Sequence, residues 1–207
     1  MKFVLFCEGA TEKGALPDFL RRWLNAKLPV RIGIQPVHFS GWAELVKDSP
    51  TKARLHLRNP DVIAVIALLD LYGPTFYPPN CIAADERYGW AKAHLEKQVG
   101  NELRFRQHFA VHDLEAWILS QPELLPAEVR KKLPGKVTQP ETINFNEPPA
   151  YLLDRLYEEA TKRGYKKVTY GDKLFRELDA NVVAHRCPSF RRMTEDMVAL
   201  AKAALGA

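Results

Sequence analysis

The chain has 207 residues, 46% of them hydrophobic and 27% charged, so it is long enough to bury a sizeable core and has the composition of a globular protein. The formal net charge of +5 favours a polyanionic partner only mildly, since Lys/Arg and Asp/Glu are spread along the whole chain. No stretch approaches the roughly 20 apolar residues of a membrane span.

Cysteine usage and the first residues indicate a compartment. Cys7, Cys81 and Cys187 are widely spaced and form no Cys-x-x-Cys pair, which disfavours a disulfide framework or a zinc knuckle. The apolar residues that precede Glu8 are too few for a signal peptide. We therefore expect a cytoplasmic protein with free thiols and no membrane partner.

The first half of the chain alternates strand and helix patterns. The run at 61–69 is almost wholly aliphatic, as expected of a central parallel strand that is buried on both faces. Apolar residues recur at helical spacing between Leu16 and Leu24. The proline-rich and aromatic segment Gly73–Cys81 predicts a rigid loop. The remaining patterns predict, in chain order, strands at 2–7 and 31–39, helices at 42–57 and 83–100, and a strand at 104–111.

This βαβαβαβ order predicts an α/β fold with a doubly wound, mostly parallel sheet flanked by helices. From about residue 113 the pattern changes to helices and proline-punctuated loops. We expect residues 1–112 to form the α/β core and residues 113–207 a helical extension that packs on the carboxyl-end face of the sheet, in one structural unit. The helices expected in the extension lie at 115–119, 151–161, 172–178 and 189–205.

Acidic residues end two of the predicted strands. The first apolar run stops at Glu8-Gly9, and the most apolar run stops at Asp70. Ligands of parallel α/β sheets sit beyond the carboxyl ends of the strands, where carboxylates form an oxygen-rich site suited to Mg²⁺ or Mn²⁺. The alternatives are an acid at a helix N-terminus for Glu8 or Glu12 and an Asx-turn for Asp70.

The segment after the fourth strand supplies further candidates. Glu115 begins an otherwise apolar helix, so its carboxylate is expected to face the same edge of the sheet, with His112 as a possible accessory. Asp113 and Glu115 could equally be a helix N-cap and a first-turn acid. An acidic site with one histidine suits Mg²⁺ or Mn²⁺ better than zinc.

Basic residues of the extension are less specific. Solvated helix faces explain most of them, although any of them could meet phosphates; Lys173 is the one we retain as an accessory site candidate. The others are Lys166, Lys167, Arg186, Arg191 and Arg192.

A strand that ends Glu-Gly, paired with a strand that ends in an Asp motif, resembles a Toprim domain, the metal-dependent module of topoisomerases, primases and some nucleases. The usual Toprim motif is Asp-x-Asp, whereas here the third position is Tyr72, so Glu115 is the natural replacement acid. The whole chain resembles a bacterial family of unknown-function domains with a Toprim-like fold. The matching segments are Val4–Glu12, Leu69–Gly73, His112–Ser120, Pro140–Asn144, and Gly171 with Cys187–Phe190.

Some members of that family are nuclease subunits of PARIS anti-phage systems, which partner an ABC-type ATPase and act on tRNA. The resemblance implies a metal-dependent nuclease with Glu8, Asp70 and Glu115 as its core, Glu12 as a further ligand, and nucleic acid and an ATPase as partners. Two rivals stay open: a binding or regulatory subunit whose site has decayed, and a small-molecule nucleotide phosphohydrolase that uses the aromatic residues Tyr72, Phe76 and Tyr77 to stack a base. Oligomeric state is left open.

Overall fold

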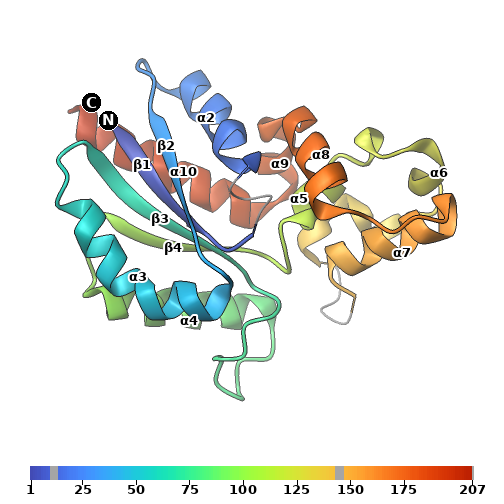
Figure 1. Ribbon diagram of the computed structural model, residues 1–207, viewed down its shortest axis with the longest axis horizontal. Helices are drawn as coiled ribbons and strands as arrows, with labels where there is room; N and C mark the ends of the chain where they lie inside the picture. The colour runs from blue at the N-terminus through green and yellow to red at the C-terminus, as the bar shows by residue number, and fades with distance from the viewer. Residues whose placement is uncertain (10–13, 143–146, 207) are drawn as a thin grey trace.

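Four parallel strands form the sheet at the centre of the protein (Figure 1). The computed structural model describes residues 1–9, 14–142 and 147–206, and only the backbone of residues 136, 138 and 168. The strand order is β2-β1-β3-β4, and every neighbouring pair is parallel. The strands are β1 (Lys2–Cys7), β2 (Gly33–His38), β3 (Val62–Asp70) and β4 (Phe105–Ala110).

The strand β3 is buried along its whole length except for the last residue, Asp70. It pairs with β1 on one side and with β4 on the other, so both of its edges and both of its faces are covered. An aliphatic run without polar alternation is stable only in that position. The predicted central strand is therefore confirmed, and the acid that ends it emerges at the carboxyl edge of the sheet.

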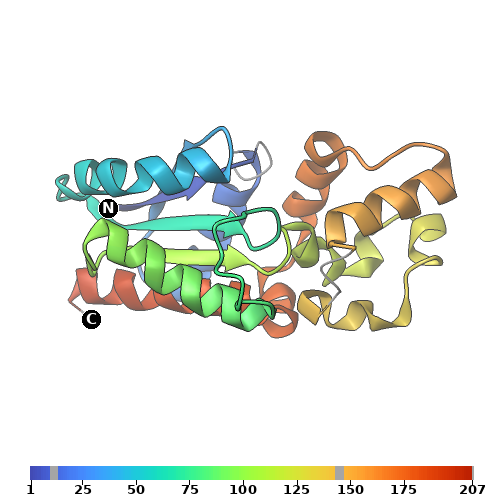
Figure 2. The same ribbon diagram turned by 90° about the horizontal axis from the view of Figure 1, so that it is seen from below.

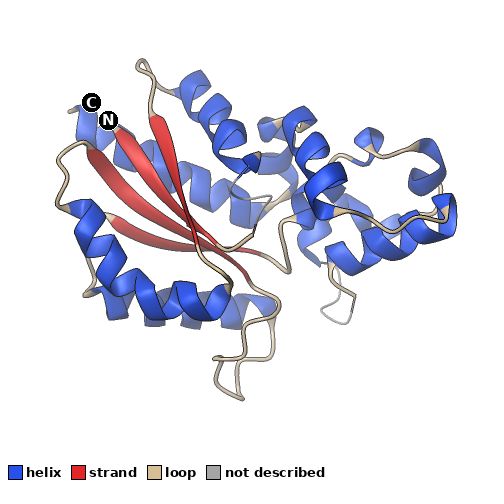
Figure 3. Ribbon diagram, viewed as in Figure 1, coloured by secondary structure: helices blue, strands red, loops and turns tan. Residues whose placement is uncertain are grey.

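Helices cover both faces of the sheet (Figure 3). The helices α2 (Leu16–Lys27) and α10 (Pro188–Leu205) pack on one face, and α3 (Trp42–Leu57) and α4 (Ala84–Val99) pack on the other. The prediction of an α/β fold with a parallel sheet flanked by helices is confirmed. The expectation that the whole tail lies at the carboxyl end is wrong for α10, because its apolar face packs against β3, β4 and α2.

The rest of the extension lies beyond the carboxyl ends of the strands, as Figures 1 and 2 show from two directions. Trp117 anchors it, fully buried with its ring against those of Phe175 and Phe190. The sequence predicted neither α6 nor α9. The elements are α5 (Glu115–Leu119), η1 (Pro122–Leu124), α6 (Ala127–Arg130), η2 (Gly135–Thr138), η3 (Pro140–Thr142), α7 (Pro149–Thr161), η4 (Lys167–Gly171), α8 (Asp172–Glu177) and α9 (Ala180–Arg186).

The strand order creates a topological switch between β1 and β3. From β1 the chain moves outward to β2, and from β3 it moves outward to β4 on the other side. In open α/β sheets a crevice forms at such a point, outside the carboxyl ends of the strands. Among the described helices none is long and apolar enough to cross a membrane.

Candidate active site

Glu8 and Asp70 meet at the switch between β1 and β3. Asp70 ends β3, and Glu8 directly follows β1, which is its hydrogen-bonded neighbour in the sheet. The backbone N–H of Asp70 donates to Oε1 of Glu8 over 3.2 Å. The two strand-ending acids that the sequence singled out therefore lie side by side at the edge where this fold class binds ligands.

The Glu8 carboxylate lies in a half-buried position at the N-terminus of α3. It also accepts a hydrogen bond from the backbone of Trp42, the first residue of that helix. Burial raises the pKa of Glu8, while the hydrogen bonds from Asp70 and Trp42 and the positive charge of Lys167 oppose the rise. The helix N-terminus that Glu8 meets is thus that of α3. A raised pKa equips this carboxyl to carry a proton.

The segment after β4 turns sharply and brings acids to the same edge. His112 adopts a positive φ of 69°, an uncommon conformation for a residue with a side chain. Its ring is buried, which lowers its pKa, and it hydrogen-bonds the backbone of Glu141. His112 therefore links the end of β4 to the backbone of η3, and the turn that it makes directs Asp113 and Glu115 toward the site.

Asp113 is buried and caps a helix. Its Oδ2 accepts from the backbone N–H of Ala150, the second residue of α7, over 3.1 Å. Burial and the nearby charge of Glu115 raise the pKa of Asp113 to about 7, although the Ala150 bond and Lys167 oppose the rise. The N-cap position of α5 is Leu114, not Asp113, and the helix N-terminus that the Asp113 side chain bonds is that of α7, well separated from it in sequence.

Glu115 is buried at the start of α5 and pairs with a lysine. Its Oε2 lies 3.1 Å from Nζ of Lys167, whose own side chain is half exposed. Burial alone would lower the pKa of Lys167, yet the carboxylates of Glu115, Asp70 and Asp113 raise it. Since Lys167 also interacts electrostatically with Glu8, one ammonium group serves four carboxylates. We call these five residues the acid cluster: Glu8, Asp70, Asp113, Glu115 and Lys167.

Lys167 is the member that sequence reasoning did not select. It stands beside Lys166 in a polar stretch, and only its place in the fold distinguishes the two. Lys173, the basic residue that the sequence favoured, is exposed on α8, and no contact with the acid cluster is found for it among the described residues.

Tyr72 is partly exposed; its N–H donates to the carbonyl of His112, and its ring meets that of Tyr151 edge-on. Glu12 lies outside the described residues.

The groups of the acid cluster that could bind a metal ion are its four carboxylates, and carboxylate oxygens are the ligands that Mg²⁺ and Mn²⁺ prefer. Within the described residues, no three His, Cys, Asp or Glu side chains are grouped closely enough to enclose a metal ion. Mg²⁺, however, is commonly held by one or two carboxylates and completed by water and substrate phosphate. Glu8 and Asp70 fit that second arrangement, while Glu115 is engaged by Lys167.

The aromatic loop that follows β3 packs on the body of the protein. Phe76 stacks on Tyr77 at 4.8 Å and also meets Trp42 and Trp90. The hydroxyl of Tyr77 donates to the carbonyl of Leu71 over 2.9 Å. Two of the three rings proposed for stacking a base are therefore already engaged with the protein.

Comparisons with solved structures show the fold alone. The C-terminal region of the Burkholderia pseudomallei OLD protein is similar over 98% of each chain, with 17% identity and a TM-score of 0.51. The C-terminal region of the Xanthomonas campestris pv. campestris OLD protein is 18% identical, with a TM-score of 0.45 over 97% of this chain and 96% of that one. The first likeness confirms the predicted α/β fold.

Comparison with curated proteins gives no match. A family model, described as a domain of unknown function and named DUF4276, matches residues 7–198. That span includes the carboxyl edge of the sheet, the acid cluster and most of α10. The chain therefore belongs to the DUF4276 family.

Proposed function

We propose that the protein is a divalent-metal-dependent phosphodiester hydrolase that acts on nucleic acid. The observation that carries the proposal is the meeting of Glu8 and Asp70 at the β1/β3 switch, with Asp70 N–H bonded to Glu8 Oε1. The likeness in fold to the C-terminal region of the Burkholderia pseudomallei OLD protein is consistent with a Toprim-like nuclease domain. Mg²⁺ or Mn²⁺ is the proposed cofactor.

The residues of the acid cluster have separable roles in this proposal. Glu8 and Asp70 would hold the metal ion, with Glu115 as a third carboxylate if it leaves Lys167. A divalent ion bound there would polarise the scissile phosphate and lower the pKa of an attacking water. Lys167, half exposed and positively charged, would meet a non-bridging phosphate oxygen. The raised pKa of Glu8 suits it to give a proton to the leaving oxygen, as an alternative to binding the metal.

Family resemblance supports a narrower version of the proposal. Relatives among PARIS anti-phage systems act as toxic effectors against tRNA and partner an ABC-type ATPase. On that ground we propose tRNA as the first nucleic acid to test, and an ATPase of this class as the first partner to test.

The proposal is tested by cleavage of mixed tRNA, single-stranded DNA and plasmid with Mn²⁺ or Mg²⁺. We expect cutting by the wild type, none in excess chelator, and none by Glu8→Gln. The matched control is Glu195→Gln, an exposed glutamate on α10, which should cut like the wild type. Metal-dependent cutting that survives Glu8→Gln would overturn the proposed site.

A second candidate function is a binding or regulatory subunit that does not cut. The observation in its favour is the Lys167–Glu115 ion pair. It places the ammonium group of Lys167 among the carboxylates that would otherwise coordinate a metal ion. This candidate predicts no cutting of any of the three substrates and no Mn²⁺ affinity that depends on Asp70. A small-molecule phosphohydrolase is less well supported, because the Phe76 and Tyr77 rings are packed against the protein.

A further inference from the structure

A cavity of about 610 Å³ opens on the side of the edge strand β4. It lies where α4 begins, where β4 ends and where α9 passes into α10, and η3 closes a further side. Its size falls in the range of about 300–1,000 Å³ that is typical of small-molecule sites. The residues that carry the argument are Tyr88, Val111, Glu141, Arg186 and Arg192.

The strand register brings this cavity next to the proposed metal site. Asp70 pairs with Ala110 across the β3–β4 ladder, and Val111, the next residue, forms part of the cavity wall. Neighbouring strands lie about 4.8 Å apart. A nucleic-acid strand whose phosphate rests against Asp70 therefore has this cavity within reach of an adjacent nucleotide.

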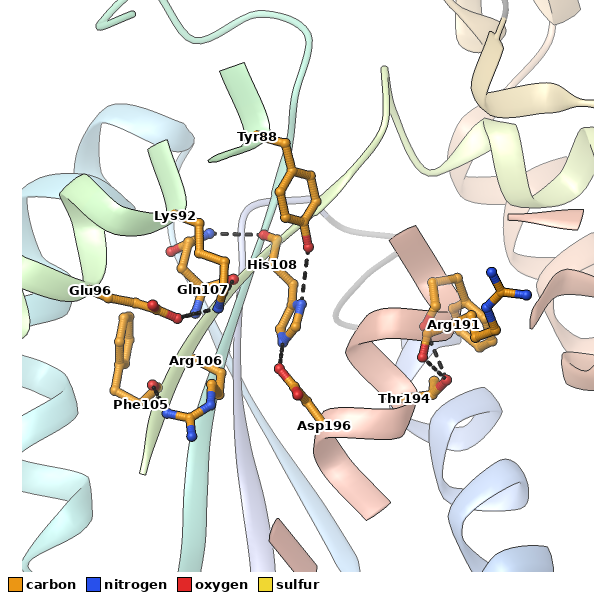
Figure 4. A network of polar contacts seen from close by, with 11 residues as sticks. Tyr88, Lys92, Glu96, Phe105, Arg106, Gln107, His108, Arg191, Thr194 and Asp196 are labelled. Atoms are coloured by element: carbon orange, nitrogen blue, oxygen red, sulfur yellow. Dashed lines mark hydrogen bonds and ion pairs between the residues drawn. The ribbon is translucent and has the colours of Figure 1, made fainter. Parts of the chain in front are cut away.

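One wall offers a flat, positively charged platform. The guanidinium carbon of Arg192 lies 4.3 Å from the centroid of the Tyr88 ring, and Arg192 itself is exposed. Tyr88 is fixed from behind, because its hydroxyl lies 3.2 Å from Nδ1 of His108, whose Nε2 lies 3.2 Å from Oδ2 of Asp196 (Figure 4). A guanidinium plane held in this way is a surface on which a nucleic-acid base can stack.

The lining of the cavity carries two arginines, Arg186 and Arg192, and two acids, Asp85 and Glu141. Arg186 is held in place by its bond to the carbonyl of Ser120, 2.6 Å away, and it joins His185 and Arg192 in the lining. The acid Glu141 is already engaged, since its carboxylate accepts from the backbone N–H of Ser189 at the start of α10 over 3.0 Å. Arg192 therefore offers a stacking plane for a base, and Arg186 a charged partner for the phosphate attached to it.

We infer that this cavity binds one nucleotide of the nucleic-acid strand next to the one that is cut, with its base on Arg192 and its phosphate toward Arg186. The inference rests on the proposed nuclease function for the role of the nucleotide, although the binding itself needs neither metal nor cleavage. In the cleavage reaction the cavity would act as a specificity subsite.

The test is calorimetric titration of the full chain with AMP, CMP, GMP and UMP in excess chelator. We expect binding of at least one mononucleotide, and binding at least about tenfold weaker in Arg192→Met, as loss of a base stack predicts. The matched control is Arg191→Met, which removes the neighbouring exposed arginine that does not line the cavity and should bind like the wild type. Thermal unfolding of each variant establishes that it is folded.

Three outcomes would overturn the inference: no mononucleotide binds at millimolar concentration, Arg192→Met binds as well as the wild type, or inorganic phosphate binds as tightly as the mononucleotides. Because metal is chelated, these results are independent of cleavage. Nucleotide binding without any nuclease activity would overturn the proposed function and leave the cavity as a nucleotide site.

Discussion

Two polar networks flank the edge strand β4, and they are built in opposite ways. In the acid cluster, Lys167 faces four carboxylates, and the pKa values of Glu8 and Asp113 are raised. In the second network, Tyr88, His108 and Asp196 link α4, β4 and α10, one contact to the next (Figure 4). Crowding like charges costs stability and is expected where chemistry is done, whereas a chain of matched partners stabilises the fold.

Among the variants that test this comparison, Asp70→Asn is expected to have the largest effect, which is on the cleavage rate. We expect cleavage to fall by about a thousandfold, which corresponds to about 4 kcal/mol of transition-state stabilisation. The free energy of unfolding should stay level or rise, because the change removes one negative charge from the acid cluster. Cleavage rates and chemical denaturation measure the two quantities. A variant that loses activity and stability together would mean that Asp70 is structural.

Asp113→Asn tests whether the crowded negative charges of the acid cluster destabilise the folded protein as the pH rises. The folded-state pKa of about 7 lies above the ordinary 3.8, so the ionised form is disfavoured in the folded protein. The stability that this group provides is present below the ordinary pKa and is lost as the pH rises toward 7. We expect Asp113→Asn to match the wild type near pH 4 and to exceed it by about 2–4 kcal/mol at pH 8, from 1.36 kcal/mol per pKa unit.

Denaturation of Asp113→Asn is measured in metal-free buffer across that pH range. Asparagine keeps an oxygen that can accept from Ala150 N–H, so the cap on α7 is retained. The exposed Asp61→Asn is the control and should show no such trend. A stability difference that does not change with pH would contradict the assignment.

Lys167→Met removes the cation from the acid cluster. Glu115 is buried and would lose its charged partner, so we expect the protein to lose about 1–3 kcal/mol of stability, less than the 3–5 of a fully buried pair because the Lys167 side chain is half exposed. Lys166→Met, next along the chain, should change little. The double variant Lys167→Met with Glu115→Gln should regain most of the loss, and failure to regain it would place the effect elsewhere.

The smallest expected effect lies in the second network. Burial lowers the pKa of His108 below its ordinary 6.5, so stability is present above that value and is lost as the pH falls. His108→Gln should cost about 1–2 kcal/mol at pH 7.5 through the lost hydrogen bonds, and less at pH 5.5, where the wild type has itself weakened. The exposed His38→Gln is the control. An equal cost at both pH values would show that His108 does not titrate.

The sequence predicted those parts of the molecule that local pattern controls. The aliphatic run of β3, the acid at its end and the last helix, expected at 189–205 and found at Pro188–Leu205, all follow from residue types at fixed spacing. The place of α10 on the sheet face, together with α2, did not follow, because it depends on how the extension folds back. The same holds for Lys167, which resembles its neighbour Lys166 until the chain brings it to Glu115.

The candidate site residues likewise divide into those that local sequence pattern predicts and those that only the tertiary fold brings together. Glu8 and Asp70 could be paired in advance, because parallel strands deliver their carboxyl ends to one edge. The capping of α7 by Asp113 and the bond from His112 to the backbone of Glu141 join segments about 30 residues apart or more, which no spacing rule connects. Tyr72 stands where the usual motif has a second acid, and its N–H extends the pairing between the segments that follow β3 and β4.

The most direct test of the account is Mn²⁺ binding to the isolated chain, measured by calorimetry for the wild type and Asp70→Asn. The account predicts that the wild type binds Mn²⁺ and that Asp70→Asn loses this binding while it stays folded. No binding by the wild type, or equal binding by Asp70→Asn, would contradict a divalent-metal site at the β1/β3 switch.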